Sequence, residues 1–437
     1  MRDYALLAIV AVLALSALRY PWIGVMLWTW VSIMNPHRYT FGAAYDAPLA
    51  LVAVITTLIG FLAERDKGSP FKGPAVMVFL VFSMWMTLSW LLGLDPEGDY
   101  YQWNKVIKVY FMIFIALSLL RTKQHIFALV WVCAGSLALL GIKGGIFTIM
   151  TGGGERVWGP PNSFIEDNNE FAVALIMTVP LLRFLQMQLQ SAWGRRAMTA
   201  AMVLLVISAI GSHSRGALLA IVATVAMLWL RDSRKVRGLL LIIPVAVAVL
   251  AFAPDRWFNR METIESYEAD KSAMGRISAW WTAFNLAKER PLGVGFNPAR
   301  PDIFAMYSPT PEMIQGAHSI YFQILGNHGF IGLFLWLGIW VLTWRSASWL
   351  RKHGREAPEA QWAAQFGAMA HASMVAYFVG GAFLGLAYFD LPYNIMAAVV
   401  LTRVWVQKKA WLTEAAPPKR RWLRVPGLAG PKPAASA

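Results

Sequence analysis

Long apolar runs alternate with short polar segments along almost the whole chain. The runs lie near 4–18, 22–34, 46–63, 74–93, 105–120, 126–150, 170–188, 197–212, 216–230, 238–253, 319–344, 365–385 and 388–406. A helix of about 20 apolar residues crosses the hydrocarbon core of a bilayer, so these thirteen runs are candidate membrane spans. Because Arg19 and Pro21 interrupt the first two, those two form either a hairpin or one span plus a partial one, and the predicted number is 12 or 13.

Composition supports a membrane protein and excludes other classes. Hydrophobic residues make up 57% of the 437 residues and charged residues only 14%. Soluble globular chains carry about 25% charged residues, so a soluble enzyme, a disordered protein and a fibrous protein are all excluded. We expect one all-α polytopic domain of about 12 transmembrane helices over residues 1–406. The first run has no small-residue cleavage site before Arg19, so we expect it to be retained as a span.

The basic residues are distributed unevenly between alternate loops. The chain carries 39 Lys and Arg against 24 Asp and Glu, a net charge of +15. Fifteen of these basic residues lie in the segments 65–72, 121–123, 195–196, 231–237 and 345–355. The short loops that alternate with these segments hold only three, Arg38, Arg156 and Arg215. By the positive-inside rule the first set is cytoplasmic, so the charge needs no nucleic-acid partner to explain it.

The same rule places the C-terminal tail in the cytoplasm. Residues 407–437 are basic and rich in Pro and Ala, which predicts a disordered tail attracted to anionic membrane lipids.

Three segments on the opposite side depart from the apolar pattern. They are the Gly/Pro-rich loop 151–169, the turn Gly211–Arg215 and the long aromatic loop 254–318. Within the long loop, Gly275–Arg290 has apolar residues at helical spacing, which predicts an amphipathic helix on the outer face of the bundle. Loops of more than about 15 residues are usually functional or disordered. We therefore expect the chemistry of the protein to lie in these three segments, on the non-cytoplasmic face.

Two arginines in these segments are candidate anion ligands. Arg215 lies in SHSRG, among small polar residues that let a ligand approach the backbone and guanidinium together. Arg276 opens the predicted amphipathic helix, where a cation is unfavourable against the helix dipole unless an anion is bound. The alternatives are an interfacial arginine that reaches toward the headgroups for Arg215 and a solvated surface arginine for Arg276.

His318, where the long loop returns to the membrane, is the candidate general base. The alternative is an interfacial structural histidine, and His328 and His371 lie within apolar runs without an evident partner. The single cysteine, Cys133, excludes a disulfide and a thiolate cluster. The chain has no DxD pair, no HExxH and no Walker A motif, so we expect no metal and no cofactor.

The order of several motifs resembles a known superfamily. They are GPPNSFIEDNNEFA, SHSRGALLA, R-x3-W-W-x-A, PLGVGF and AHSIYFQILGNHGFIG. Together they resemble the O-antigen ligase and polymerase superfamily over nearly the whole chain up to residue 406. The stretches ALRYPWIGVMLWTWVSIMNPHRYTFG and LLGIKGGIFTIMTGGGERVWGPPNSFIEDNN are similar to the O-glycosylation ligase branch associated with exosortase A systems.

The resemblance implies a metal-independent membrane glycosyltransferase of the GT-C type. Such an enzyme moves a glycan from undecaprenyl pyrophosphate to an acceptor hydroxyl, here foremost a lipid A core sugar, at the periplasmic face of the bacterial inner membrane. It implies that Arg215 and Arg276 bind the donor pyrophosphate and that His318 is catalytic. Supporting positions are Arg156, Asn169, Lys143 and His213.

The stereochemistry and the function class have alternatives. A single displacement inverts the anomeric centre, whereas retention needs a carboxylate nucleophile; Glu166 and Asp167 are nearby, but we expect them to orient arginines or the loop backbone. A protein O-oligosaccharyltransferase and a polysaccharide polymerase share the donor and differ in the acceptor. A lipid-linked glycan transporter would show internal repeats and helices broken at the midplane, and a structural export subunit would tolerate replacement of Arg215 and His318.

The predicted topology is testable with cysteine labelling. A cysteine introduced at 163 should react with a membrane-impermeant reagent, and one introduced at 234 should be protected, because only that arrangement keeps the basic loops inside. Protection at 163 together with labelling at 234 would overturn the topology.

Overall fold

The computed structural model describes residues 2–231 and 271–414, and in these residues the secondary structure is helical with no β-strand. The helices are α1 (Arg2–Arg19), α2 (Pro21–Met34), α3 (Leu49–Ala63), α4 (Pro74–Leu91), α5 (Pro96–Leu119), α6 (Lys123–Met150), α7 (Asn168–Gln188), α8 (Ala192–Ile210), α9 (Arg215–Arg231), α12 (Lys271–Glu289), α13 (Pro301–Tyr307), α14 (Ile320–His353), α15 (Gln361–Gly381) and α16 (Asp390–Gln407).

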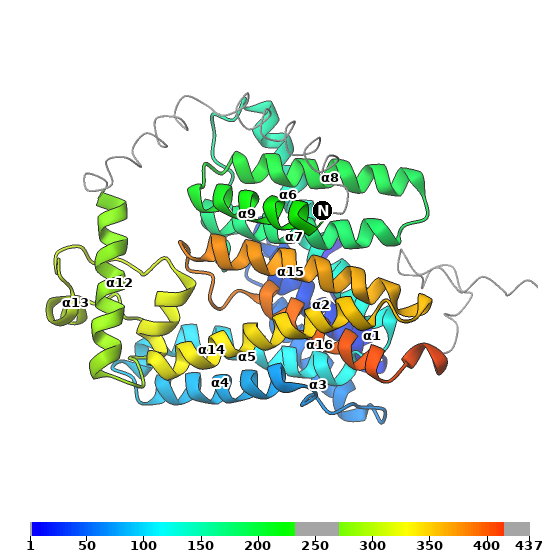
Figure 1. Ribbon diagram of the computed structural model, residues 1–437, viewed down its shortest axis with the longest axis horizontal. Coiled ribbons are helices and arrows are strands. Elements are labelled where there is room, and N and C mark those ends of the chain that lie inside the picture. Colours follow the sequence, from blue (N-terminus) through cyan, green and yellow to red (C-terminus); the bar gives the residue numbers. More distant parts are fainter. Residues whose placement is uncertain (1, 232–270, 415–437) are drawn as a thin grey trace, which may run out of the picture.

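The long helices form a bundle, and α12 stands across one end of it (Figure 1). Helix α15 packs against α7, α9 and α14, and α14 also packs against α4 and α12. Twelve of the thirteen predicted runs fold as helices in the described residues, while the run 238–253 lies outside them. The first two runs form the helices α1 and α2, which pack against each other. The predicted amphipathic helix is confirmed as α12.

The described chain is an all-helical polytopic membrane protein. Five of its helices, α4, α6, α7, α8 and α14, are long and apolar enough to cross a membrane, and α2, α3 and α9 are shorter apolar helices. The number of about 12 spans stays a prediction. Helix α15 has fully buried polar positions at His371 and Ser373. A helix enclosed by other helices needs less apolar surface than one that faces lipid, which accounts for its lower hydropathy.

Small residues bring α6 close to α8. A Cβ at Gly144 would overlap the Ser208 hydroxyl, and one at Gly145 would overlap the carbonyl of Leu204. Small residues at helix interfaces in membranes let two backbones approach closely. This contact sets the position of the turn that follows α8.

Helix α14 is broken at Gly329, which has φ 69° and ψ −173°. The break frees the carbonyl of Asn327, which accepts hydrogen bonds from the backbone N–H groups of Val294 (3.0 Å) and Gly295 (3.1 Å). Non-helical backbone at membrane depth persists only where protein groups satisfy it. The PLGVGF turn of the long loop is therefore docked into the break of α14.

Two histidines for which the sequence shows no partner have partners on other helices. The ring of His328 shares a hydrogen bond with the Ser89 hydroxyl (3.0 Å) through Nδ1 and another with the Tyr388 hydroxyl (2.8 Å) through Nε2. The Nε2 atom of His371 lies 3.0 Å from the Trp344 carbonyl. The expectation was wrong because these partners are distant in the sequence and meet only through helix packing.

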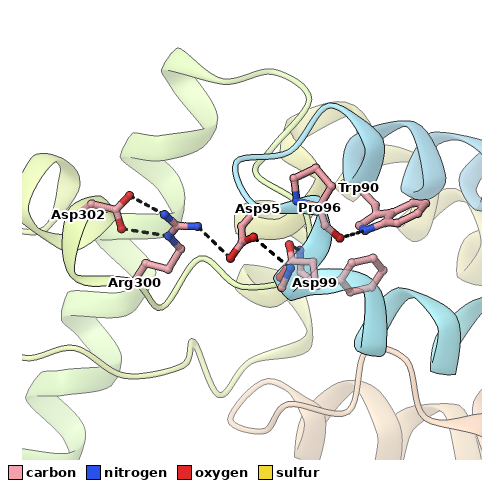
Figure 2. A network of polar contacts seen from close by, with 8 residues as sticks. Trp90, Asp95, Pro96, Asp99, Arg300 and Asp302 are labelled. Carbon is pink, nitrogen blue, oxygen red and sulfur yellow. Dashed lines mark hydrogen bonds and ion pairs between the residues drawn. The ribbon is translucent and has the colours of Figure 1, made fainter.

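A polar network fixes the segment after α12 to the start of α5 (Figure 2). Arg300 donates two hydrogen bonds of 3.0 Å to Asp302 and lies 3.6 Å from Asp95. The buried carboxylate of Asp99 accepts a 2.6 Å hydrogen bond from the Phe296 N–H. Burial raises the pKa of Asp99, and the hydrogen bond from Phe296 opposes that rise. Because exposed ion pairs contribute little, the buried Asp99 contact is the main anchor.

The basic segments 65–72 and 121–123 lie together at one end of the bundle, near Lys408 after α16. Arg121 pairs with Asp66, and the Lys123 N–H donates to Glu414 at 2.9 Å. Glu414 is the last described residue of the predicted tail 407–437, and residues 415–437 fall outside the described residues. The assignment of this end to the cytoplasm stays a prediction.

The break in α14 should tolerate no side chain at Gly329. Ala at this position would place a Cβ on the Pro291 carbonyl and would adopt a conformation that costs a non-glycine residue about 1–3 kcal/mol. We expect a lower melting temperature in detergent for Gly329→Ala. Gly338→Ala is the matched control in the same helix, because its Cβ meets only Val78 at 3.4 Å. Equal melting temperatures for the two variants would contradict this account.

Candidate functional site

The turn after α8 is tied to the loop between α6 and α7. His213 has a left-handed backbone (φ 59°), and its buried ring lies with Nε2 2.8 Å from the Gly153 carbonyl. The Val157 N–H donates to the Gly211 carbonyl at 3.3 Å. Two of the three predicted outer segments therefore form one unit, and His213 tethers them.

Arg215 begins α9 directly after this turn and is half-buried. The Ser214 hydroxyl accepts a hydrogen bond from the Ala217 N–H (3.2 Å), and the Asn168 side chain donates to the Ser212 carbonyl (2.6 Å). These contacts place the N-terminus of α9 beside the N-terminus of α7. Helix N-termini favour anions through their free N–H groups and dipole, so an anion near Arg215 would be stabilised by both.

Asp167 caps α7 and faces the site. Its Oδ1 accepts 2.8 Å hydrogen bonds from both the N–H and the side-chain amide of Asn169. Burial alone would raise the pKa of Asp167, but hydrogen bonds from Glu170 and Asn169 outweigh it and lower the pKa below its usual value. Glu170 is buried, and it also accepts a hydrogen bond from the Gly385 N–H at 3.3 Å. Asn169 therefore acts in the structure as a support for Asp167.

His318 interacts electrostatically with both Arg276 and Asp167. It has a left-handed backbone (φ 41°) and an exposed side chain two residues before α14 begins. Partial desolvation and the positive charge of Arg276 lower the pKa of His318 from 6.5, and the negative charge of Asp167 opposes them. The structure thus brings three residues from distant segments into electrostatic contact. Near pH 7 the imidazole is neutral and can accept a proton.

Two further predicted residues, Lys143 and Arg156, have exposed side chains. Lys143 is exposed on α6, with Nζ 4.7 Å from the centre of the Tyr39 ring. Arg156 is exposed in the loop between α6 and α7. Their assignment to the site stays a prediction. Glu166 accepts a 2.8 Å hydrogen bond from the Asn162 N–H, which confirms that it orients loop backbone.

An interaction between a buried aspartate and a half-buried lysine was missed in the sequence. Asp390 at the start of α16 is only 2% exposed and accepts a hydrogen bond from Ser32. Lys105 of α5 interacts electrostatically with Asp390, and its Nζ lies 4.0 Å from the centre of the Phe164 ring. The sequence does show one lysine and one aspartate inside two predicted spans. Because charges there are costly unless paired, both residues could have been selected as candidates, although not as partners of each other.

Within residues 2–231 and 271–414, no group of three or more His, Cys, Asp or Glu side chains is placed to hold a metal ion.

Replacing the two neighbours of His318 should move its pKa in opposite directions. Arg276→Gln removes a positive charge and should raise the pKa, whereas Asp167→Asn removes a negative charge and should lower it. Diethyl pyrocarbonate reacts with the neutral imidazole, so the pH dependence of His318 modification, followed by peptide mass spectrometry, measures this pKa. Unchanged values in both variants would show that the three side chains are not in electrostatic contact.

Comparisons with known proteins give two family matches. Residues 1–190 match a family of unknown function (DUF5935). No curated protein is significantly similar to the chain. One chain from the solved structure titled "Structural coordination of polymerization and crosslinking by a peptidoglycan synthase complex" is 16% identical with a TM-score of 0.40, covering 77% of this chain and 97% of that one. At that TM-score the likeness does not establish a shared fold.

The second match covers Arg215, Arg276 and His318. Residues 200–337 match the family described as O-antigen ligase. The relation to the exosortase-associated branch stays a prediction. The match over residues 200–337 supports the resemblance of the chain to the O-antigen ligase and polymerase superfamily.

Proposed function

We propose that the protein is a glycosyltransferase that moves a glycan from undecaprenyl pyrophosphate to an acceptor hydroxyl, foremost that of a lipid A core sugar. The reaction would take place at the periplasmic face of the bacterial inner membrane, without a metal. The observation that carries the proposal is the grouping of Arg276, His318 and Asp167 at the α12 end of the bundle. All but Asp167 lie within the O-antigen ligase match.

Arg215 and Arg276 would bind the donor pyrophosphate. Cleavage of the anomeric C–O bond leaves negative charge on the departing phosphate oxygens. Guanidiniums can stabilise that charge through paired, charge-assisted hydrogen bonds. Arg215 lies at the N-terminus of α9, where free backbone N–H groups and the positive end of the helix dipole also favour an anion.

His318 would act as the base. In a single displacement, the acceptor oxygen forms the new bond to the anomeric carbon, its proton passes to the imidazole, and the pyrophosphate lipid leaves with the electron pair. This route inverts the anomeric centre. The lowered pKa of His318 keeps the imidazole neutral at pH 7, and Asp167 would stabilise the imidazolium that forms. The same titration predicts that activity is lost as the pH falls through the pKa of His318, which is lower than that of an ordinary histidine.

The break in α14 is a feature that transporters also show, but its contacts favour an enzyme. The Asn327 carbonyl is taken up by the Val294 and Gly295 N–H groups and by the Ser89 hydroxyl (2.9 Å). A transported substrate would need such groups to be available. In this protein the break serves to hold the outer loop.

The test is a substitution that separates catalysis from donor binding. His318→Ala should lower turnover by roughly 10²–10⁴-fold, the usual contribution of a general base. Binding of the lipid-linked donor, measured separately, should persist because both arginines remain. Each quantity is measured on the purified protein in lipid nanodiscs.

His353→Ala is the matched control, because His353 lies at the opposite end of the same helix, stacked on Trp349. It should leave turnover unchanged. Substantial turnover by His318→Ala at neutral pH would refute the role of base. A loss of donor binding equal to the loss of activity would instead make His318 a phosphate ligand.

A further inference from the structure

The residue that joins α12 to the His318 segment is Trp280. Its Nε1–H donates a 2.7 Å hydrogen bond to the carbonyl of Ala317, the residue directly before His318. Its ring stacks on Phe322 in the first turn of α14, with centroids 5.1 Å apart and planes 7° from parallel. A second ring, Phe383, lies 6.3 Å away beyond the end of α15. Trp280 thus holds the backbone next to His318 and the start of α14 at once.

The His318 backbone needs such a restraint. A positive φ is uncommon for residues other than glycine, although histidine adopts it more readily than most. The conformation at φ 41° therefore persists where neighbouring contacts hold it. The Trp280 hydrogen bond acts on the peptide group that precedes His318.

Trp280 also shares a face of α12 with Arg276. The two residues are four positions apart in one continuous helix, so their side chains are neighbours on its surface. The helix itself is held in place, because a Cβ at Gly326 of α14 would already contact Ala283 at 3.2 Å. Arg276 and Trp280 therefore keep a fixed relation to each other and to α14.

We propose that Trp280 is a positioning residue that holds His318 at a fixed place relative to Arg276. The proposal deepens the proposed function and rests on it for the role of His318 as base. In the proposed reaction, Arg276 stabilises charge on the departing phosphate oxygens, and His318 accepts the proton of the acceptor hydroxyl. Both oxygens are partners of the same anomeric carbon, so the two side chains must keep a fixed distance. Misplacement by about 1 Å between such groups can cost roughly 10²-fold in rate.

The chain offers a matched pair of variants for the test. Trp280→Phe keeps an aromatic ring for the stack and removes only the N–H donor. Trp281→Phe is the control on the adjacent residue, whose side chain is 53% exposed and contacts Phe284 of its own helix. The pKa of His318 is measured by diethyl pyrocarbonate modification without donor or acceptor, and kcat and donor KM are measured in the transfer reaction.

We expect Trp280→Phe to raise the pKa of His318 toward 6.5, because a less restrained imidazole is less buried and farther from Arg276, and burial and that positive charge are what lower its pKa. The two charged groups that act on His318, Arg276 on α12 and Asp167 before α7, stay in place. The kcat should fall by roughly 10²-fold with donor KM unchanged. Trp281→Phe should change neither quantity.

A double-mutant cycle separates positioning from a general loss of structure. In an Arg276→Gln background, Trp280→Phe should raise the pKa of His318 by less, because the part of the rise that comes from moving away from the Arg276 charge is gone. Should Trp280→Phe not fold, Phe322→Leu loosens the same stack from the α14 side and should shift the pKa in the same direction.

Equal results for Trp280→Phe and Trp281→Phe would overturn the proposal, as would the same pKa shift in both backgrounds. Full activity of His318→Ala would overturn the proposed function instead. The pKa comparison would still decide whether Trp280 positions His318, because it uses no substrate.

Discussion

The structure depends on one constraint, which is that backbone polar groups within a bilayer must be satisfied by the protein itself. Helix α14 is broken at Gly329, so the Asn327 carbonyl loses its partner within the helix. The backbone N–H groups of Val294 and Gly295 donate to this carbonyl instead. The same contact seats the long outer loop on the bundle. The position of α12, and with it Arg276, therefore follows from the need to pair a carbonyl freed by a break in a membrane helix.

The candidate site is assembled from both matched parts of the chain. The O-antigen ligase segment 200–337 contributes Arg215, Arg276 and His318, and the segment 1–190, which matches a family of unknown function, contributes Asp167 and its neighbours. Hydrogen bonds between residues 153–168 and the turn after α8 hold the two parts together. The segment 1–190 thus supplies Asp167, which interacts with His318, as well as the scaffold around it.

Local patterns in the sequence predicted what depends on local structure. The helical spacing of Ile277, Trp280 and Phe284 was sufficient to predict α12. The positions of Arg276 at the start of that helix and of His318 at the end of the long loop were sufficient to select both as candidates. The pairing of Lys105 with Asp390 was not predictable, because it forms only when helices remote in the sequence pack together. The break in α14 was missed for the same reason, since a glycine in an apolar run shows no sign of the distant donors that satisfy the freed Asn327 carbonyl.

The central claim is that these remote segments form one donor site. It is tested most directly by an experimental structure of the inactive His318→Ala protein with undecaprenyl-pyrophosphate-linked glycan bound. The account predicts pyrophosphate oxygens within hydrogen-bond distance of both the Arg215 and the Arg276 guanidiniums, with the anomeric carbon facing position 318. A pyrophosphate bound elsewhere, or two guanidiniums that face separate cavities, would contradict it.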